Sequence, residues 1–466
     1  MTNLALHSRR VVSWCLAFVG GIACLSVSPM LGAALPKHVV LITVDGFPAY
    51  LFHDSKLAIP RLRRLATEGV SAEGMRVINP TATWPNHTTL VTGVRPEKHS
   101  VLFNGLVVLG TNGGPVSVAP DRTKADLVAV PTLYDLLHAQ GRSTAAIDWP
   151  CTSEAKTLED DFPDAPNNVL HTSARLKTEL VASHVLSDDK DESFGKMTGP
   201  GRDEVWTRAA CLVIEKRKPS LTIIHLLNTD GTHHRYGPQS PASYTALELA
   251  DSYVGRILDS LKTAGIDRDT AVIVTADHGF ASATNVIQPN VLLRQAGLIE
   301  VGSFGRITKA RVQVIPDGGI GVVYFNDPAT YQADLQKVLE LFKDREGVAD
   351  LIETNRFPEY GLPLPSLNPR MGQLIICAKD GYGLNGSFLG EQYVVPVSGT
   401  INVGYHGYIS TNPKMNAFFV AAGKGIKRGA RIGMIDNVDV APTIAHLLGV
   451  KLEQADGQVL KDILVE

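Results

Sequence analysis

Apolar residues occur along the chain in continuous runs that each stop at a polar position. Three such runs cover residues 38–44, 221–227 and 270–276. None of them alternates apolar and polar residues, and that pattern is typical of strands buried on both faces of a parallel sheet. The sequence therefore predicts at least three buried parallel strands.

Segments of helical periodicity separate these runs. They cover residues 59–68, 131–140 and 242–264. In the last segment, one apolar stripe is formed by Leu247, Leu249, Ala250, Val254, Ile257, Leu258 and Leu261, and Gly265 follows as a stop signal. Strands that alternate with helices predict βαβ units in an α/β fold, with a doubly wound, mostly parallel sheet and helices on both faces.

The pattern changes between residues 302 and 393. Short strands are expected at residues 312–315, 321–325 and 373–377, around a helix at residues 333–342. Residues 358–369 are rich in proline and are expected to form a linker. The earlier pattern then resumes with a strand at 417–422 and a last helix at 444–448. We therefore expect one α/β domain built from residues 35–301 and 394–466, with residues 302–393 inserted as a small α+β cap.

The first 34 residues have the order of a secretory signal peptide. Arg9 and Arg10 give a basic start, residues 11–27 are almost wholly apolar, and small residues follow at Ala33 and Ala34. We expect cleavage near Ala33–Ala34 and a secreted or periplasmic protein. An uncleaved N-terminal anchor is the alternative, which the Ser, Pro and Gly residues in the segment disfavour.

Composition and charge exclude several classes of protein. The 466 residues are 44% hydrophobic and 20% charged, which is too apolar and too well balanced in charge for a disordered chain. The net charge of −3 indicates no polybasic surface, so we expect no nucleic-acid duplex as a partner and no membrane contact beyond the leader. Three cysteines follow the leader, Cys151, Cys211 and Cys377, and they allow at most one disulfide within the chain. The oligomeric state is left open.

Three aspartates come after the buried runs. Asp45, Asp230 and Asp277 would all lie beyond the carboxyl ends of strands, where open α/β sheets bind ligands. Carboxylates gathered there repel one another, so they need cations or raised pKa values. His234 and His278 lie close in sequence to these aspartates. A mixed Asp and His set suits zinc, with manganese or iron as lesser alternatives.

A threonine precedes a predicted helix start. Pro85 suits the first turn of a helix, so Thr83 would lie at the helix N-terminus, where backbone N–H groups and the helix dipole favour anions. A metal-bound hydroxyl at that point is largely ionised and therefore nucleophilic. The alternative is that Thr83 only caps the helix.

These segments together resemble the nucleotide pyrophosphatase/phosphodiesterase family of the alkaline phosphatase superfamily. Trp84 stands in a segment that is Thr-Phe-Pro-Asn-His in that family, and Asp230 and His234 match its Asp-x-x-x-His spacing. The matching segments, in chain order, are residues 41–46, 83–87, 92–104, 149–150, 230–238, 277–279 and 404–408. Each segment alone is a weak signal, but all of them in the family's order are a strong one.

The resemblance implies an alkaline-phosphatase-like fold and a site that binds two zinc ions. One ion would be held by Asp45, Thr83, Asp277 and His278, and the other by Asp230, His234 and His406. It also implies that Thr83 attacks phosphorus to give a phospho-threonine intermediate, and that Asn104 donates a hydrogen bond to a phosphoryl oxygen. Trp84, Asn104 and Trp149 would contact a small phosphate ester such as a nucleotide.

The chain also departs from the family pattern. His233 stands before His234 where the family usually has Gly, and we choose His234 because its interval from Asp230 matches. The family stacks a base against a later Tyr, but no Tyr occurs between Trp149 and Asp230. Phe162 or Trp206 would have to replace it as the second wall of the pocket.

Other functions remain open at this point. A phosphonoacetate hydrolase or a phosphomonoesterase of the same superfamily would use the same metals, whereas a sulfatase is disfavoured because no cysteine has the required context. The alternative from another class is a non-catalytic extracellular binding protein on a vestigial scaffold.

Overall fold

The computed structural model describes Met1 and residues 35–111, 113–398 and 402–465. The expected signal peptide therefore lies almost wholly outside the described residues. The three cysteines that follow it are free thiols. No helix in the described part of the chain is both long enough and apolar enough to cross a bilayer.

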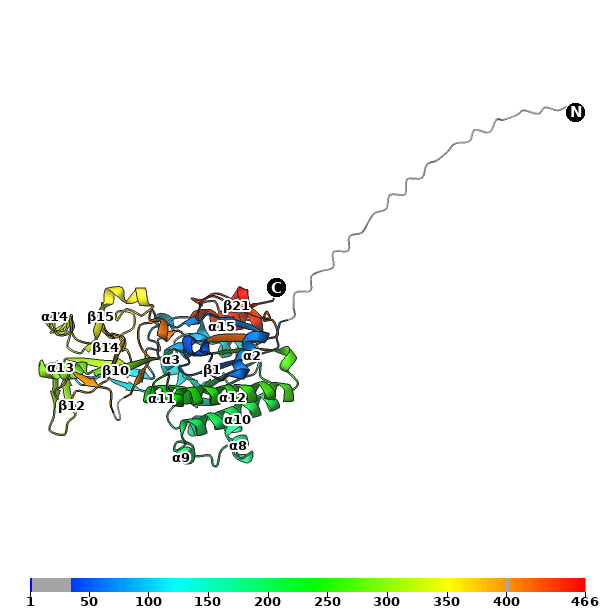
Figure 1. Cartoon of the computed structure of the whole chain (residues 1–466), viewed down its shortest axis with the longest axis horizontal. Coiled ribbons are helices and arrows are strands. Elements are labelled where there is room, and N and C mark those ends of the chain that lie inside the picture. Colours follow the sequence, from blue (N-terminus) through cyan, green and yellow to red (C-terminus); the bar gives the residue numbers. More distant parts are fainter. Residues whose placement is uncertain (2–34, 112, 399–401, 466) are drawn as a thin grey trace.

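An eight-stranded sheet forms the centre of the larger lobe (Figure 1). Its strands, in spatial order, are β21 (Ala430–Ile432), β2 (Val70–Ala72), β20 (Phe419–Gly423), β9 (Thr270–Thr275), β1 (His38–Val44), β8 (Leu221–Leu226), β6 (Thr144–Pro150) and β7 (Asp160–Asp164). Only β20 runs antiparallel to its neighbours. The expected mostly parallel α/β sheet is therefore confirmed.

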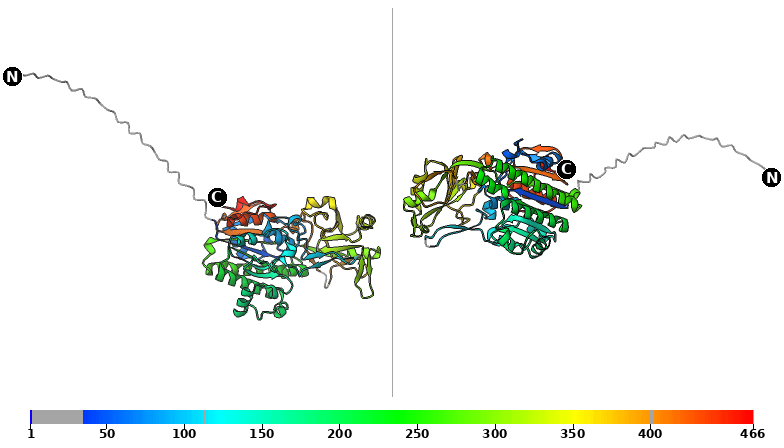
Figure 2. Two further views of the ribbon diagram at one scale, coloured as in Figure 1. Left: turned by 180° about the vertical axis from the view of Figure 1, so that it is seen from behind. Right: turned by 60° about the horizontal axis from the view of Figure 1, so that its bottom comes forward.

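Helices cover both faces of this sheet. The helices α2 (Pro60–Glu68), α10 (Gly199–Arg217) and α12 (Pro241–Thr263) pack together on one side, and the two long ones cross the sheet in green in Figure 2. The helices α3 (Thr83–Thr92), α6 (Leu133–Ala139) and α15 (Val440–Leu448) pack together on the other side. Most of the apolar stripe predicted for residues 242–264 is buried, and its members Leu249 and Leu258 are partly buried. Its burial holds α12 against the other elements of the larger lobe.

Residues from the predicted cap form a second, smaller lobe (Figure 1). Its antiparallel sheet contains β13 (Val312–Asp317), β14 (Ile320–Phe325), β16 (Leu374–Ala378) and β15 (Val348–Glu353), beside helix α14 (Tyr331–Phe342). The proline-rich segment is not a free linker, because Leu362 is buried and Leu364 partly buried in a core of this lobe. A further small sheet pairs β10 (Ala281–Ile287) with β17 (Gly381–Leu384), β18 (Val394–Pro396) and β19 (Gly404–Tyr405). This small sheet connects the two lobes.

Candidate metal centre

The predicted carboxylates lie at one end of the central sheet. Asp45 directly follows β1, and Asp277 comes two residues after β9, the neighbouring strand. Gly46 makes the turn after β1 with a φ of 65°, and its backbone N–H donates to Asp277 Oδ1 at 3.0 Å. A β-carbon at Gly46 would lie 2.7 Å from the Phe280 ring, so only glycine fits this turn.

Asp230 reaches the site from a helix rather than directly from a strand. The strand β8 ends at Leu226, and Asp230 lies in α11 (Asn228–Tyr236). One helical turn separates Asp230 from His234, so both side chains are on the same face of α11. The start of this helix is held by Asp203 of α10, whose Oδ1 accepts the backbone N–H of Leu227 at 3.0 Å.

Thr83 is the first residue of α3, and its hydroxyl does not cap the helix. Ala82 occupies the cap position and makes no side-chain cap. The Thr83 Oγ1 lies 3.5 Å from His278 Nε2 instead. The simple capping interpretation of Thr83 therefore does not hold.

One group of ligand atoms surrounds His278 Nε2. This nitrogen lies 3.4 Å from Asp45 Oδ1 and 3.3 Å from Asp277 Oδ2. Each of these two carboxylates has its other oxygen bound to the protein, Asp45 Oδ2 to His225 Nε2 at 3.0 Å and Asp277 Oδ1 to the Gly46 N–H. The oxygens that face His278 are buried and have no hydrogen-bond partner. Two such oxygens beside one imidazole nitrogen form a cradle for a cation.

A second group surrounds Asp230 Oδ1, another buried oxygen without a hydrogen-bond partner. It lies 3.4 Å from His234 Nε2 and 3.7 Å from His406 Nε2. The ring of His406 stacks on the ring of His278 with centroids 3.9 Å apart, which places the two groups side by side. The ligand atoms of Asp45, Asp277 and His278 lie within 4.8 Å of one another, and so do those of Asp230, His278 and His406.

All three histidines are oriented in the same way. The Nδ1 atoms lie 2.9 Å from Gly404 O for His234, 2.9 Å from Thr81 O for His406 and 3.1 Å from Gly279 O for His278. A backbone carbonyl can only accept, so each Nδ1 carries the proton and each Nε2 presents a lone pair. This is how histidines that bind metals are held in proteins.

The electrostatics of the site also fit a metal. Burial, followed by the charges of Asp277 and Asp230, raises the pKa of Asp45 well above its usual value. Burial lowers the pKa of His278 to about 3 and that of His406 well below its usual value. The imidazoles are therefore neutral, which is the form that binds metals, and the carboxylates lack a compensating positive charge. A divalent cation would supply that charge.

Two other histidines, His233 and His87, lie near the site but are not among the ligand groups. His233, the residue before His234, turns away and places its Nδ1 3.1 Å from Gly46 O. His87 is fully buried, with its Nδ1 2.9 Å from Thr83 O and its Nε2 2.8 Å from Thr43 Oγ1. His87 therefore holds the backbone of the Thr83 turn in place.

A cavity of about 430 Å³ is lined by Trp84, the residue after Thr83, and by Asn104, so it contains two of the three expected substrate contacts. Asn104 is exposed, and its Oδ1 accepts the Trp84 backbone N–H at 2.9 Å, which leaves its amide N–H groups free. The Trp84 Nε1 donates to Asp164 Oδ2 at 3.0 Å. Arg202 also lines this cavity, and its Nε has no hydrogen-bond partner.

Trp149 does not lie in this cavity, contrary to the expectation that it contacts substrate. Its side chain is completely buried and packs edge-on against His87, with ring centroids 4.7 Å apart. Of the two aromatic residues considered for the second wall, Trp206 lines the cavity and Phe162 does not. Sequence reasoning also missed His225, Asp164 and Arg202, because each lies outside the motifs and reaches the site only through the fold.

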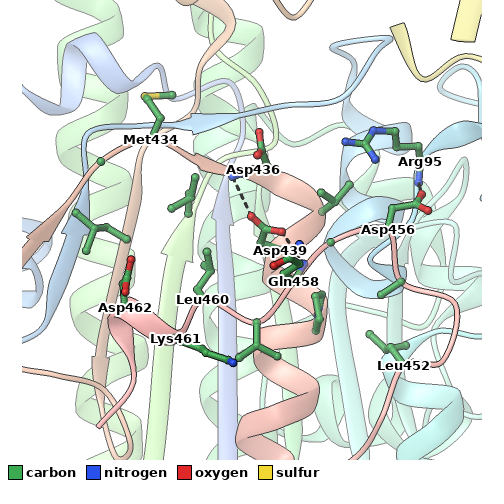
Figure 3. Close-up of a pocket in the computed structure, with 18 residues that line it drawn as sticks. Arg95, Met434, Asp436, Asp439, Leu452, Asp456, Gln458, Leu460, Lys461 and Asp462 are labelled. Carbon is green, nitrogen blue, oxygen red and sulfur yellow. Dashed lines mark hydrogen bonds between the residues drawn. The ribbon is translucent and has the colours of Figure 1, made fainter. Parts of the chain in front are cut away.

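A larger cavity lies elsewhere and contains none of these residues. It has a volume of about 830 Å³ and is lined by the C-terminal segment and Arg95 (Figure 3). Two of its carboxylates have backbone partners, because Asp456 accepts from the Arg95 N–H and Asp439 from the Gln458 N–H. The metal-ligating and nucleophilic groups are therefore concentrated at the end of the central sheet.

Comparison with known proteins agrees with this geometry. The family described as type I phosphodiesterase / nucleotide pyrophosphatase matches residues 39–409. A bis(5'-adenosyl)-triphosphatase, ENPP4, of Bos taurus is 23% identical over 91% of this chain and 81% of its own length. The ectonucleotide pyrophosphatase/phosphodiesterase family member 7 of Mus musculus is 24% identical over 97% of this chain and 91% of its own.

Solved structures show the same fold. Human ectonucleotide pyrophosphatase/phosphodiesterase 5 superimposes with a TM-score of 0.69 at 17% identity, over 92% of this chain and all of that one. The murine protein 5, solved as an inactive variant in complex with AMP, superimposes with a TM-score of 0.68 over the same shares. The chain therefore belongs to the type I phosphodiesterase / nucleotide pyrophosphatase family, whose members are metal-dependent hydrolases of phosphoric ester bonds.

Proposed function

We propose that this protein is a two-zinc phosphodiesterase or nucleotide pyrophosphatase that works through a phospho-threonine intermediate on Thr83. The observation that carries the proposal is the paired arrangement of free oxygens and Nε2 atoms beside the Thr83 hydroxyl. Asp45, Thr83, Asp277 and His278 would hold one ion, and Asp230, His234 and His406 the other. The oxygen and nitrogen donors suit zinc, and manganese or iron are the alternatives.

The residues of the chain have distinct parts in the proposed reaction. When bound, the metals supply positive charge that polarises the phosphate and ionises hydroxyl groups. Thr83 Oγ1 attacks phosphorus and the leaving oxygen departs, which forms the phospho-threonine. Water then attacks the same phosphorus and releases Thr83. The free amide of Asn104 donates a hydrogen bond to a phosphoryl oxygen, which stabilises the charge that develops there.

The cavity beside Thr83 would bind the organic part of the substrate. The names of two relatives refer to adenosyl or nucleotide substrates, and a related structure contains AMP. We propose a nucleotide for this chain too, held between Trp84 and Trp206 with its polar edge toward Asp164 and Arg202. Asp164 and Arg202 are charged residues of the same cavity, so we expect them to influence which base this protein prefers.

We also propose that the protein is secreted or periplasmic. The leader at residues 1–34 supports this, and one of the relatives is named as an ectoenzyme. The assignment of residues 35–301 and 394–466 to the catalytic domain and of 302–393 to a cap is part of the same proposal. The insertion contacts the site through its β13–β14 turn, where the Gly319 N–H donates to His406 O at 2.8 Å.

Metal analysis combined with a substrate panel tests the proposed function. The panel contains bis-p-nitrophenyl phosphate, the p-nitrophenyl ester of a nucleoside 5'-monophosphate, p-nitrophenyl phosphate and phosphonoacetate. Two zinc ions per chain with turnover of the two diesters are expected. Preferred turnover of phosphonoacetate or of the monoester would replace the proposed reaction by that of a superfamily relative. Absence of both bound metal and turnover would indicate the non-catalytic binding protein.

A further inference from the structure

A strained aspartate lies behind the candidate metal centre. Asp148 has a φ of 54°, a conformation that residues other than glycine adopt uncommonly and that is strained within a strand. It lies in β6, where the pairing with β7 shifts register between Ile147 and Pro150. Asp148 is fully buried, and neither of its carboxylate oxygens has a hydrogen-bond partner. An unpaired buried carboxylate is costly, so its position calls for a functional reason.

The side chain beside Asp148 is His225. Its Nδ1 lies 3.0 Å from the Asp148 backbone oxygen and 3.5 Å from Asp148 Oδ2. Its other nitrogen, Nε2, lies 3.0 Å from Asp45 Oδ2. His225 is completely buried between β1 and β6 and stacks beside His87, with ring centroids 4.4 Å apart. The three side chains form a continuous chain from Asp148 through His225 to Asp45.

The contacts between these three side chains explain a difference between the two carboxylates of the first metal group. The rear oxygen of Asp277 is held by a backbone N–H, which the turn at Gly46 fixes. The rear oxygen of Asp45 is held only by the side chain of His225. The direction of Asp45 Oδ1 toward His278 therefore depends on a side chain that can be substituted.

We propose that His225 is a positioning residue for Asp45 and that Asp148 orients His225 for this purpose. The proposal rests on the two-metal function proposed above. A hydrogen bond to Asp45 Oδ2 requires a proton on His225 Nε2, although Nδ1 also faces only acceptors. Asp148 holds the ring from the other side, because its backbone oxygen lies 3.0 Å and its Oδ2 3.5 Å from Nδ1. His225 then fixes the direction of Asp45 by this hydrogen bond, and the metal position in front of Asp45 is preorganised.

Graded chelation of the zinc-loaded protein tests this proposal. His225→Leu removes the hydrogen bond at similar volume, whereas His225→Gln keeps an amide N–H that can reach Asp45. We expect His225→Leu to lower the affinity for one ion about 10–100-fold and to leave the affinity for the other ion unchanged. His225→Gln should recover most of the lost affinity. Adding Asp230→Asn to His225→Leu should remove the retained ion too. Asp148→Asn should give an intermediate loss, because Asn also tolerates the positive φ.

A matched control separates positioning from a general loss of a buried histidine. His99 is equally buried and bonds to Thr89 Oγ1 and the Val101 N–H, so His99→Gln should leave both ions in place. Unchanged affinity for both ions in His225→Leu, or equal losses in His225→Leu and His225→Gln, would overturn the proposal. If His225→Leu does not fold, Asp148→Asn and His225→Gln decide it, and wild-type affinity in Asp148→Asn refutes it. A wild-type protein that binds fewer than two ions would instead refute the proposed function.

Discussion

At the scale of single residues, the site is defined by which atoms lack partners. Asp45 and Asp277 each have one oxygen bound to the protein and one free oxygen facing His278 Nε2. The three histidines are likewise held at Nδ1 and free at Nε2. Since buried polar atoms are normally paired, this consistent set of free atoms is the strongest sign of a cation site.

The Asp277 carboxylate gives the first test at this scale. Asp277→Asn keeps the oxygen that accepts the Gly46 N–H but replaces the facing oxygen by an amide nitrogen, which is a poor metal ligand. Zinc content measured by mass spectrometry should fall from two ions to one per chain. Asp251→Asn is the matched control, because Asp251 is a buried aspartate whose oxygens accept backbone N–H groups far from the site. Two ions retained in Asp277→Asn would remove Asp277 from the ligand set.

The Thr83 hydroxyl gives the second test at the scale of single residues. Thr83→Ala removes the proposed nucleophile, so diester turnover should fall on the order of 10⁴-fold or more, while both metals stay bound. Thr92→Ala at the far end of the same helix should retain turnover, because Thr92 Oγ1 bonds only to backbone, donating to Thr88 O and accepting the Val94 N–H. Turnover in Thr83→Ala within tenfold of wild type would mean that a different group attacks phosphorus.

Buried histidines predict a pH dependence of stability. Burial lowers the pKa of His99 to about 3, whereas an unfolded histidine titrates near about 6.5. Below that pH the unfolded chain binds a proton that the folded chain excludes, so His99 makes the protein less stable as the pH falls from about 6.5 toward 3. Between pH 7 and pH 5 this costs about 2 kcal/mol. Between pH 7 and pH 5, the free energy of unfolding measured in urea should therefore fall less in His99→Gln than in the wild type, by that amount. An identical fall in the two proteins would contradict the burial of a neutral His99.

At the scale of elements, the second metal group depends on the contact between α11 and β19. His234 Nδ1 bonds to Gly404 O, and His406 follows two residues after Gly404. A β-carbon at Gly404 would lie 2.1 Å from His233 O, so the close approach of strand and helix requires glycine. This backbone contact therefore orients His234 directly and places the segment that carries His406, whose ring is held by Thr81 O.

Two glycine substitutions test this contact. Gly404→Ala should separate β19 from α11, lower the affinity for one zinc about 10–100-fold and destabilise the protein by about 1–3 kcal/mol. Gly231→Ala on α11 is the control, since no atom lies within 4 Å of its β-carbon position and alanine favours a helix by roughly 0.5–1 kcal/mol. Chelator titration and thermal unfolding measure both effects. Equal metal affinity in the two variants would show that the contact does not position the ligands.

Local sequence signals predicted some elements and not others. The buried runs could be identified because they are continuously apolar, and the stripe of α12 because it has a helical period. The helix α11 could not, because Gly231 and its neighbours are poor helix formers, and the helix is stabilised by Asp203 from α10. The burial of Trp149 was also missed, since every residue of β6 is buried and the sequence does not show which face a side chain takes.

At the scale of the whole molecule, the parallel sheet is what brings the site together. Asp45 and Asp277 follow neighbouring strands, although they are far apart in the sequence. Asp277 lies 231 positions after Gly46, the residue next to Asp45. The order of the strands explains why the motifs predicted these residues, because polar positions at equivalent strand ends meet in such a sheet. His225 and Asp148 could not be predicted in this way, since their contact depends on the β1–β8–β6 pairing and on one strained residue.

The most direct test of the account is the location of the metals. Crystals of the zinc-loaded protein, measured at the zinc absorption edge, should give two anomalous peaks per chain. One peak should lie between Asp45 Oδ1, Asp277 Oδ2 and His278 Nε2, beside the Thr83 hydroxyl, and the other beside Asp230, His234 and His406. A single peak, or peaks that contact none of these atoms at saturating zinc, would contradict the two-metal account.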